Sequence, residues 1–188
     1  NETLYQKKAE LLTAFRTVYP DIIGAYEKIR FSTKDLPESQ FLYGEQAPEP
    51  LLVTENGVQF ATYLNEGLMT GIFLDQKEVR GRLVDGFAVG KTVLNMFSYT
   101  GAFSVAAAMG GAVATTSVDL AKRSLPKTTE QFEVNHLNLA PQKIIVMDVF
   151  DYFKYASRKG LSYDMIILDP PSFARNKKKV FSVAKNYG

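Results

Sequence analysis

The sequence predicts an α/β protein whose main part is a doubly wound domain with a parallel sheet, preceded by a smaller α+β element. From residue 91 onward, four apolar strand patterns alternate with three helix patterns. This alternation implies right-handed crossovers between parallel strands. Three of the four strands end in an aspartate, at Asp119, Asp148 and Asp169. Because ligands of such sheets bind outside the carboxyl ends of the strands, these acids indicate a binding site.

The first 85 residues are expected to form the α+β element, and residues 86–188 the first part of the larger domain. Apolar side chains at helical spacing before Pro20 predict an opening helix. Asn56-Gly57 tolerates the positive φ of a tight turn and therefore predicts a hairpin. In order, the expected elements are a helix at residues 2–18, a strand at 24–31, a surface loop at 32–50, a hairpin at 51–54 and 58–64, a strand at 71–75 and a helix at 76–84.

The larger domain is expected to include a strand from Met165 to Leu168 that is apolar on both faces, as in a sheet between two helix layers. An apolar edge strand invites unwanted pairing, and proteins normally cover it. We therefore expect further strands beyond Gly188. The expected strands are residues 92–97, 114–119, 144–148 and 163–169, and the expected helices are residues 102–109, 126–137 and 149–158.

Composition narrows the class of protein. No run of about 18 apolar residues could span a membrane, and no secretory signal opens the chain, so we expect a cytoplasmic protein with no membrane partner. The sequence contains no cysteine and one histidine, so we expect no disulfide, cysteine nucleophile or metal site within it. Residues 1–90 carry 9 basic and 13 acidic side chains, whereas residues 91–188 carry 13 and 7. The second part therefore offers either a surface for a polyanion or a solvated basic face.

The first strand of the larger domain runs into a short turn from Phe97 to Gly101. The turn has a single glycine, unlike the Gly-x-Gly-x-x-Gly of dinucleotide enzymes, which disfavours a hydride-transfer protein. One glycine still lets the backbone come close to a ligand. Ser98 or Thr100 can cap the next helix or donate a hydrogen bond to a carboxylate.

The acids at the later strand ends suit a nucleoside. Asp119 follows Gly101 by 18 residues and can accept hydrogen bonds from both hydroxyls of a ribose. Asp148 can either cap the following helix or accept from the exocyclic amine of adenine. The rigid turn Asp169-Pro170-Pro171 ends the fourth strand. Together with the single-glycine turn, these acids point to S-adenosylmethionine.

Several of these segments are also similar to one family. The segments Phe-Leu-Asp-Gln at 73–76 and Asn-x-Phe-Ser-Tyr-Thr-Gly at 95–101 are specific in combination. They resemble the large-subunit (23S) ribosomal RNA methyltransferases I and K, which are class I, S-adenosylmethionine-dependent RNA methyltransferases with a Rossmann-like sheet. The similarity runs from about residue 50 to residue 188 and is carried by residues 65–67, 70–76, 94–103, 117–119 and 169–173.

The resemblance implies a role for each matching residue. The turn Phe97–Gly101 would face the methionine part of the cofactor, and Asp119 would hold the ribose, with Leu120 beside the adenine. Asp148 would meet the adenine amine, and Asp169 would lie next to the methyl group and the target base. The implied cofactor-binding residues are Phe73, Gln76, Phe97, Ser98, Tyr99, Thr100, Gly101, Asp119, Leu120, Asp148, Val149 and Asp169, with Thr70 closing the pocket beside them, and the implied catalytic residues are Asp169 and Pro170.

The resemblance also implies RNA, in particular ribosomal RNA, as the partner, and it leaves a homodimer open. In that family an RNA-binding PUA domain usually precedes the similar part. Methylation of cytosine C5 requires a thiolate, and Ser172, which follows the two prolines, is a poor substitute. Transfer to a guanine nitrogen therefore stays an alternative to C5. A nicotinamide-dependent oxidoreductase and a non-catalytic RNA-binding module are the alternatives to a methyltransferase.

Three further signals carry less weight. The basic segment 175–179 follows the Asp-Pro-Pro turn and can either clamp RNA phosphates or form a solvated loop. Arg80 and Arg82 are expected on a solvated helix face, with contacts to RNA or to the cofactor carboxylate as the alternative. His136, the single histidine, is expected to be structural.

Overall fold

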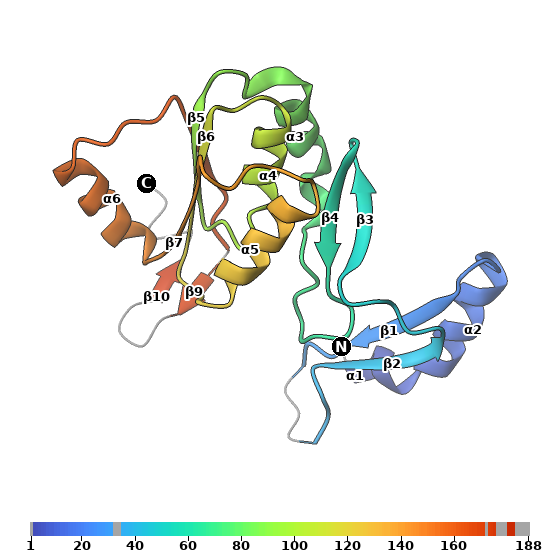
Figure 1. Cartoon of the computed structure of the whole chain (residues 1–188). Helices are drawn as coiled ribbons and strands as arrows, with labels where there is room; N and C mark the ends of the chain where they lie inside the picture. Colours follow the sequence, from blue (N-terminus) through green and yellow to red (C-terminus); the bar gives the residue numbers. More distant parts are fainter. Residues whose placement is uncertain (1, 32–34, 172, 176–179, 183–188) are drawn as a thin grey trace. The chain divides into compact units, whose positions relative to one another are not determined.

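The computed structural model describes residues 2–31, 35–171, 173–175 and 180–182, and Figure 1 labels its elements. The chain divides into two compact units. Unit 1 comprises Asn1–Val53 and Ala61–Ile72, and unit 2 comprises Thr54–Phe60 and Phe73–Gly188. The three acids expected at the sheet edge therefore all belong to unit 2.

Unit 1 contains two helices and an antiparallel strand pair. The single helix expected at residues 2–18 is wrong, because Lys7 N–H donates to Leu4 O at 3.1 Å and tightens the chain into a separate turn. The loop expected at residues 32–50 contains a strand. Its cross-strand aromatic pair, Tyr26 with Phe41 at 5.4 Å between ring centroids, outweighs the turn-rich composition around it. The elements are α1 (Glu2–Gln6), α2 (Lys8–Val18), β1 (Gly24–Lys28) and β2 (Ser39–Gly44).

The expected hairpin is confirmed as β3 (Leu51–Glu55) and β4 (Val58–Thr62), and it contributes residues to both units. Its turn residues Asn56 and Gly57 have φ of 52° and 77°, as an Asn-Gly hairpin requires. Within unit 2, the side chain of Asn135 forms two hydrogen bonds with the backbone of Gln59 in the same hairpin. The Asn135 amide donates to the Gln59 carbonyl at 2.7 Å, and its oxygen accepts from the Gln59 N–H at 2.9 Å.

The strand expected at residues 71–75 is wrong. Gly71 has a φ of 112°, and a Cβ at this position would lie 2.7 Å from the carbonyl oxygen of Ala61. The chain therefore turns closely against its own hairpin instead of extending, a path that only glycine allows. Beyond the turn, the elements are a 3-10 helix η1 (Leu74–Gln76), helix α3 (Lys77–Arg82) and a π-type turn η2 (Leu83–Phe87).

Unit 2 is built on a four-stranded sheet in the order β7-β6-β5-β8, and the pairings between neighbours are all parallel. This confirms the predicted α/β fold. The register brings Met96 level with Val118 on one side and with Leu168 on the other. The three strands therefore end at the same side of the sheet, with Asp119 as the last residue of β6. The strands are β5 (Thr92–Met96), β6 (Ala114–Asp119), β7 (Gln142–Val146) and β8 (Met165–Leu168).

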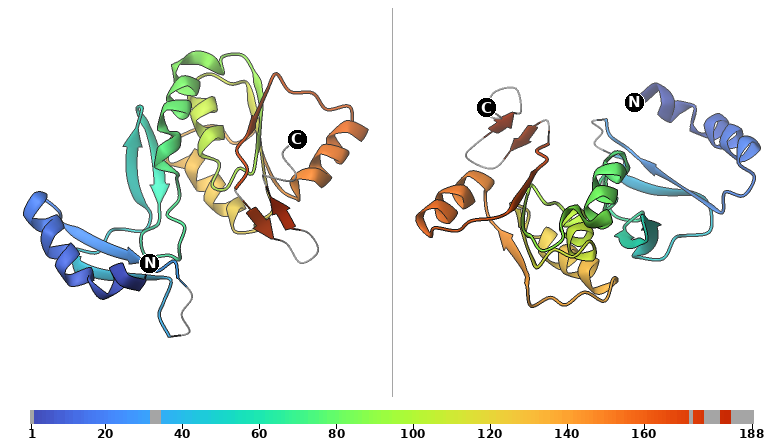
Figure 2. Two further views of the ribbon diagram at one scale, coloured as in Figure 1. Left: turned by 180° about the vertical axis from the view of Figure 1, so that it is seen from behind. Right: turned by 90° about the horizontal axis from the view of Figure 1, so that it is seen from above.

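Helices cover both faces of this sheet, as Figures 1 and 2 show. Helices α4 (Ala102–Met109) and α5 (Ser124–Glu133) lie on one face, and α6 (Val149–Arg158) lies on the other. The α4 side buries Val93, Ala106 and Ala107 together with residues of η2. The α6 side buries Leu94, Met96, Val118, Val149, Tyr152 and Ala156. Alternate residues of β5 thus supply both cores, which fixes the strand between the two layers.

Strand β8 forms one edge of the described sheet. Met165 and Ile167 pack towards the α4 core, whereas Ile166 on the opposite face is 54% exposed. A short antiparallel pair follows, β9 (Phe173–Arg175) with β10 (Val180–Ser182). Among the described residues, no helix combines the length and apolar character needed to cross a membrane.

Candidate active site

The turn after β5 has an unusual backbone. Phe97, Tyr99 and Gly101 have positive φ values of 57°, 52° and 78°. Bonds between backbone groups that hold the turn include those from Ser98 N–H to Val118 O at 3.0 Å and from Gly101 N–H to Ser98 O at 2.7 Å. Two non-glycine residues in this region are strained, and such strain persists only where the surroundings determine it.

Gly101 is required by packing as well as by its φ. A Cβ at this position would lie 2.5 Å from Cγ2 of Thr128, which is fully buried on α5. Gly101 itself occupies the N-cap position of α4 and has no side chain that could cap the helix. Whether the hydroxyl of Ser98 or Thr100 caps this helix or donates to a carboxylate stays open. Their side chains are buried beneath the turn, at 8% and 1% exposure.

Asp119 joins the end of β6 to this turn. Its Oδ2 accepts from the backbone N–H of Tyr99 at 2.9 Å, and its Oδ1 accepts from the N–H of Ala121 at 2.8 Å. An ionised carboxylate has about four lone-pair sites, so both oxygens retain acceptor capacity. The two backbone bonds fix the orientation of the carboxylate at the carboxyl edge of the sheet. The next residue, Leu120, is 45% exposed beside it in the chain.

Two of the residues expected to close the pocket also lie in unit 2. The ring of Phe73 packs on the ring of Tyr99, with centroids 5.5 Å apart and planes inclined at 52°. Phe73 is 51% exposed, so one side of its ring is open to a ligand. Gln76 is half-buried at the end of η1. Thr70 belongs to unit 1, where its carbonyl accepts from Tyr63 N–H at 2.9 Å.

Arg80 is not on a solvated helix face as expected. Its side chain is 2% exposed and forms a two-pronged ion pair with Glu55, through Nε at 2.7 Å and a terminal nitrogen at 2.8 Å. The same terminal nitrogen donates to the carbonyl of Phe73 at 2.9 Å. Arg82, in contrast, is exposed as predicted. Glu55 lies 25 residues before Arg80, so the spacing of charges along the helix gave no sign of the pair.

Asp148 performs the capping role that the sequence left open. Its Oδ1 accepts from Phe150 N–H at 3.0 Å and from Asp151 N–H at 3.4 Å, at the start of α6. The neighbouring Val149 is 5% exposed and packs in the α6 core. The side chain of Val149 is thus placed in the core, and the two backbone bonds place the carboxylate of Asp148 at the start of α6.

Asp169 leaves β8 at the same edge of the sheet. Although its side chain is exposed by surface area, partial desolvation raises the pKa of Asp169, and the negative charge of Asp75 raises this pKa further. Pro170 and Pro171 follow it directly. Ser172 lies outside the described residues, as do the side chains of the basic segment 175–179.

Sequence reasoning missed a buried polar network beneath the turn. Asn95 on β5 donates to Ser104 on α4 at 3.0 Å, and Ser104 shares a hydrogen bond of 2.7 Å with Ser117 on β6. All three side chains are at most 1% exposed. They tie the two strands to the helix that follows the turn. The only signal in the sequence was the presence of polar residues inside apolar strand patterns.

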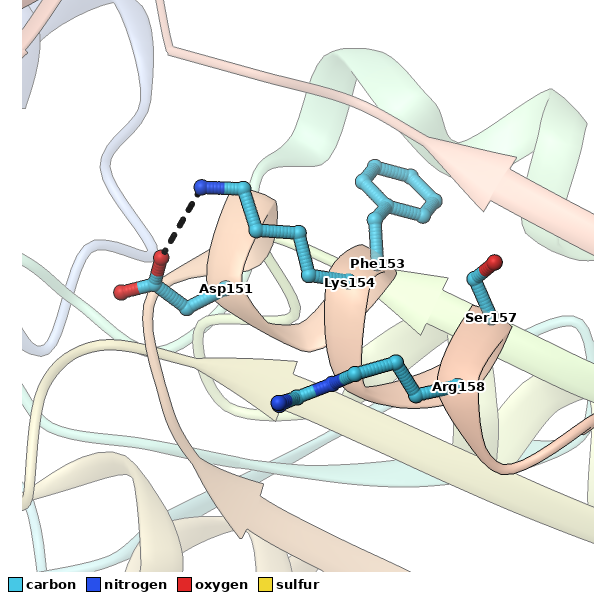
Figure 3. Close-up of a pocket in the computed structure, with 5 residues that line it drawn as sticks. All are labelled: Asp151, Phe153, Lys154, Ser157 and Arg158. Atoms are coloured by element: carbon cyan, nitrogen blue, oxygen red, sulfur yellow. Dashed lines mark ion pairs between the residues drawn. The ribbon is translucent and has the colours of Figure 1, made fainter.

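An open hollow on the surface of α6 is a poor candidate for the site. Its lining residues, drawn in Figure 3, are Asp151, Phe153, Lys154, Ser157 and Arg158. All five come from one helix, so the hollow lacks the converging walls of a ligand pocket. The single ion pair in it, Lys154 with Asp151 at 3.8 Å, is exposed and contributes little.

Comparison with known proteins now decides the family. Residues 25–188 match the family described as S-adenosylmethionine-dependent methyltransferase. The chain belongs to this family. This match contradicts the alternative hypothesis of a nicotinamide-dependent oxidoreductase.

Relatives of this methyltransferase chain carry ribosomal RNA names. YwbD of Bacillus subtilis, whose name places it with the ribosomal RNA large subunit methyltransferases, is 55% identical over 186 residues, which are 98% of this chain and 47% of YwbD. Ribosomal RNA large subunit methyltransferase I of Aeromonas salmonicida is 35% identical over 183 residues, which are 95% of this chain and 46% of that protein. The chain thus spans about half the length of the curated relatives it matches.

Solved methyltransferase structures share the fold. The crystal structure of SMU.776 complexed with SAH superposes with a TM-score of 0.91 and 62% identity, covering 98% of this chain and 47% of that one. A methyltransferase structure from Agrobacterium tumefaciens gives a TM-score of 0.73 at 26% identity, covering 91% and 54%.

The residues of this family member fit the cofactor in the family description. An oriented acid on Asp119 suits a ribose, and the exposed ring of Phe73 suits an apolar contact with a ligand. Under the turn, Oγ1 of Thr128 is fully buried and finds no hydrogen-bond partner among the described residues. Because the turn packs this closely on α5, its backbone is held in a fixed position for contact with a ligand.

Proposed function

We propose that the protein binds S-adenosylmethionine at the carboxyl edge of the β6-β5-β8 strands and transfers its methyl group to a base of large-subunit ribosomal RNA. One observation carries the proposal. Asp119, at the end of β6, is bonded to Tyr99 in the strained turn after β5. This unites an acid for ribose and a close-packed turn at one edge of the sheet, where ligands of such sheets bind.

The residues of the chain then act by binding and orientation. When bound, S-adenosylmethionine supplies an activated methyl group on a positively charged sulfur. Asp119 accepts hydrogen bonds from the ribose hydroxyls, and the turn Phe97–Gly101 faces the methionine part. Phe73 covers the ligand with its exposed face, and Gln76 and Leu120 flank it. Aligning the methyl donor and the acceptor in this way lowers the activation free energy by several kcal/mol. For transfer to nitrogen, the protein therefore needs no nucleophile of its own.

Asp169 and Pro170 form the other side of the proposed site. A carboxylate whose pKa is raised by partial desolvation and by Asp75 accepts hydrogen bonds readily and can take up a proton. Asp169 would hold an N–H of the target base, and Pro170 would stiffen the turn that carries it. This arrangement suits a guanine nitrogen. Cytosine C5 is the second candidate atom, and its thiolate would have to come from outside these 188 residues, which contain no cysteine.

RNA as the substrate is supported by the names of the relatives and by the basic composition of the second half of the chain. A location in the cytoplasm agrees with a ribosomal substrate. A homodimer stays a prediction, which light scattering of the purified protein would check.

The test uses S-adenosylhomocysteine and ribosomal RNA. Calorimetric titration should give saturable binding of S-adenosylhomocysteine to the intact protein, and NAD should give none. With tritiated S-adenosylmethionine, the protein should label large-subunit RNA from a strain that lacks the corresponding gene. Mass spectrometry of the digested nucleosides then separates methylated guanine from 5-methylcytosine. Binding without any methyl transfer to RNA would favour the non-catalytic module instead.

A further inference from the structure

We propose that the buried Glu55–Arg80 pair is a positioning device that holds the ring of Phe73 against Tyr99 and thereby sets the affinity for the cofactor. The inference rests on the proposed function, because it assigns a role to residues behind the proposed site. Neither Glu55 nor Arg80 is expected to touch the cofactor, since their side chains are 7% and 2% exposed.

The geometry of Arg80 joins three segments of unit 2. Its Nε and one terminal nitrogen donate to the two carboxylate oxygens of Glu55, at 2.7 and 2.8 Å, near the tip of the β3–β4 hairpin. Its terminal nitrogen also donates to the carbonyl of Phe73 at 2.9 Å, where η1 begins. The guanidinium also lies over two aromatic rings, 5.6 Å from the centroid of Phe60 and 5.9 Å from that of Phe103. The charge is therefore buried, and three hydrogen bonds fix its orientation.

Phe73 needs such an anchor because burial does not hold it. About half of its surface is exposed, and it stands at the N-cap of a 3-10 helix of three residues, with no side-chain cap bond. Its described ring partner is Tyr99, at 5.5 Å. The bond from Arg80 fixes the backbone from which this ring projects, so the position of the ring follows from the buried pair.

The contacts continue from Phe73 to the proposed ribose acid. Tyr99, which meets the Phe73 ring, donates its backbone N–H to Asp119 at 2.9 Å. The backbone of Tyr99 is held in the left-handed region, with φ of 52°. A shift of the Phe73 ring therefore changes the packing on a strained residue that also orients Asp119.

Stability alone gives no reason for an ion pair at this place. Apolar side chains of similar volume often replace a buried pair without loss of stability. Arginine is suited to the contacts seen here because its planar fork can meet a carboxylate with two nitrogens while it donates to a third acceptor. Lysine keeps the charge but offers a single point of contact, so it cannot hold Glu55 in two-pronged fashion and the Phe73 carbonyl at once.

The experiment compares Arg80→Lys with Arg82→Lys, a matched change on the exposed face of the same helix. We expect Arg80→Lys to weaken S-adenosylhomocysteine binding by about five- to tenfold and to raise KM for S-adenosylmethionine similarly, with kcat changed less than twofold. Arg82→Lys should leave cofactor binding unchanged. Phe73→Ala should weaken binding by about tenfold or more, and adding Arg80→Lys to it should cause no further loss, because the two residues act as one unit.

A fluorescence measurement reports directly on the aromatic ring at position 73. These 188 residues contain no tryptophan, so Phe73→Trp introduces one tryptophan, whose emission can be excited separately from that of the tyrosines. Its emission should respond to S-adenosylhomocysteine in the otherwise unchanged protein, and the free-state emission should shift when Arg80→Lys is added. Should Arg80→Lys fail to fold, the pair Glu55→Leu with Arg80→Met replaces both charges by apolar groups and should show the same loss of affinity.

The outcomes separate the two proposals. If the unchanged protein does not bind S-adenosylhomocysteine, the proposed function fails and this inference fails with it. If the unchanged protein binds and the folded Arg80 variants bind equally well, the positioning role is wrong and the proposed function stands. Losses for Arg80→Lys and Phe73→Ala that multiply in the double variant would also overturn the role.

Discussion

The two acids at the ends of β6 and β7 differ in what they hold. Asp119 accepts from Ala121 two residues ahead, and also from Tyr99 in the turn after a different strand. Asp148 accepts from Phe150 and Asp151, both in the first turn of its own helix. The same sequence signal, an aspartate at a strand end, has therefore produced one residue that links two loops and one that caps a helix.

The difference teaches what makes a strand-end acid a candidate ligand. A cap that serves its own helix is sufficient reason for an aspartate, and it contributes about 1 kcal/mol to stability. A carboxylate that is bonded to a strained neighbouring turn does more than stabilise its own segment. The free-energy cost of the strain in that turn must be offset by surrounding contacts. We therefore expect the cofactor to depend on Asp119 far more than on Asp148.

The largest effect is expected for Asp119→Ala. Loss of two charge-assisted bonds to the ribose, each about 1.5–3 kcal/mol, should weaken S-adenosylhomocysteine binding more than a hundredfold in a calorimetric titration. Asp164→Ala is the matched control. Asp164 accepts from Thr92 N–H at 2.8 Å and from the Thr92 hydroxyl at 2.7 Å, at the opposite edge of the same sheet. The Asp164→Ala variant should lose stability and keep its affinity for S-adenosylhomocysteine. Equal losses of affinity in the two variants would contradict a binding site at the carboxyl ends of the strands.

The next effect is expected for Gly101→Ala. Its positive φ and the overlap with the Thr128 methyl group should together lower the free energy of unfolding by about 2–3 kcal/mol, measured by urea titration. Adding Thr128→Ser removes the methyl group and should recover part of the loss. Gly160→Ala isolates the backbone contribution, since Gly160 has φ of 61° and open space around it. A loss at Gly101 no larger than at Gly160 would mean that the turn is not closely packed.

A smaller effect is expected for Asp148→Ala. Loss of the α6 cap should lower the free energy of unfolding by about 1 kcal/mol, which corresponds to roughly 2–4 °C in Tm for a chain of this size. Asp148→Ser retains a capping oxygen and should recover most of the stability. Cofactor affinity should fall tenfold at most in either variant. A loss as large as that of Asp119→Ala would place both acids in the same role.

The smallest effect on stability is expected for Asp169→Asn, and it depends on pH. Because the pKa of Asp169 is raised in the folded protein, its contribution to stability is greatest below the unfolded pKa of about 3.9 and falls as the pH rises through the folded value. Asn should therefore raise Tm by about 1–2 °C at pH 7 and by less at pH 4. Methyl transfer should be lost at both. A lower Tm at pH 7 would contradict the raised pKa.

The sequence was sufficient for the features that depend on local pattern. The alternation of strands and helices predicted the parallel sheet, and the acids at strand ends made Asp119 a candidate site residue. Features set by long-range contacts were missed or wrong. The strand at Ser39–Gly44 forms because Phe41 meets Tyr26, and the break at Gly71 follows from close approach to Ala61. Both depend on partners that the local sequence does not name.

The candidate site shows the same division. The candidate residues at the carboxyl ends of the strands could be proposed from the sequence because their type and spacing carry chemistry. Their supports were not found, since Glu55 and Arg80 lie 25 residues apart and read as ordinary surface charges. The Asn95–Ser104–Ser117 network was missed for the same reason, because each of these residues gains its meaning from a partner on another element.

A crystal structure of the intact protein with S-adenosylhomocysteine tests the central claim most directly. The account predicts the ribose hydroxyls at hydrogen-bond distance, about 2.6–3.2 Å, from the Asp119 carboxylate, with Asp148 still capping α6. A ligand bound elsewhere, for example in the hollow on α6, with no ligand atom within reach of Asp119, would contradict it.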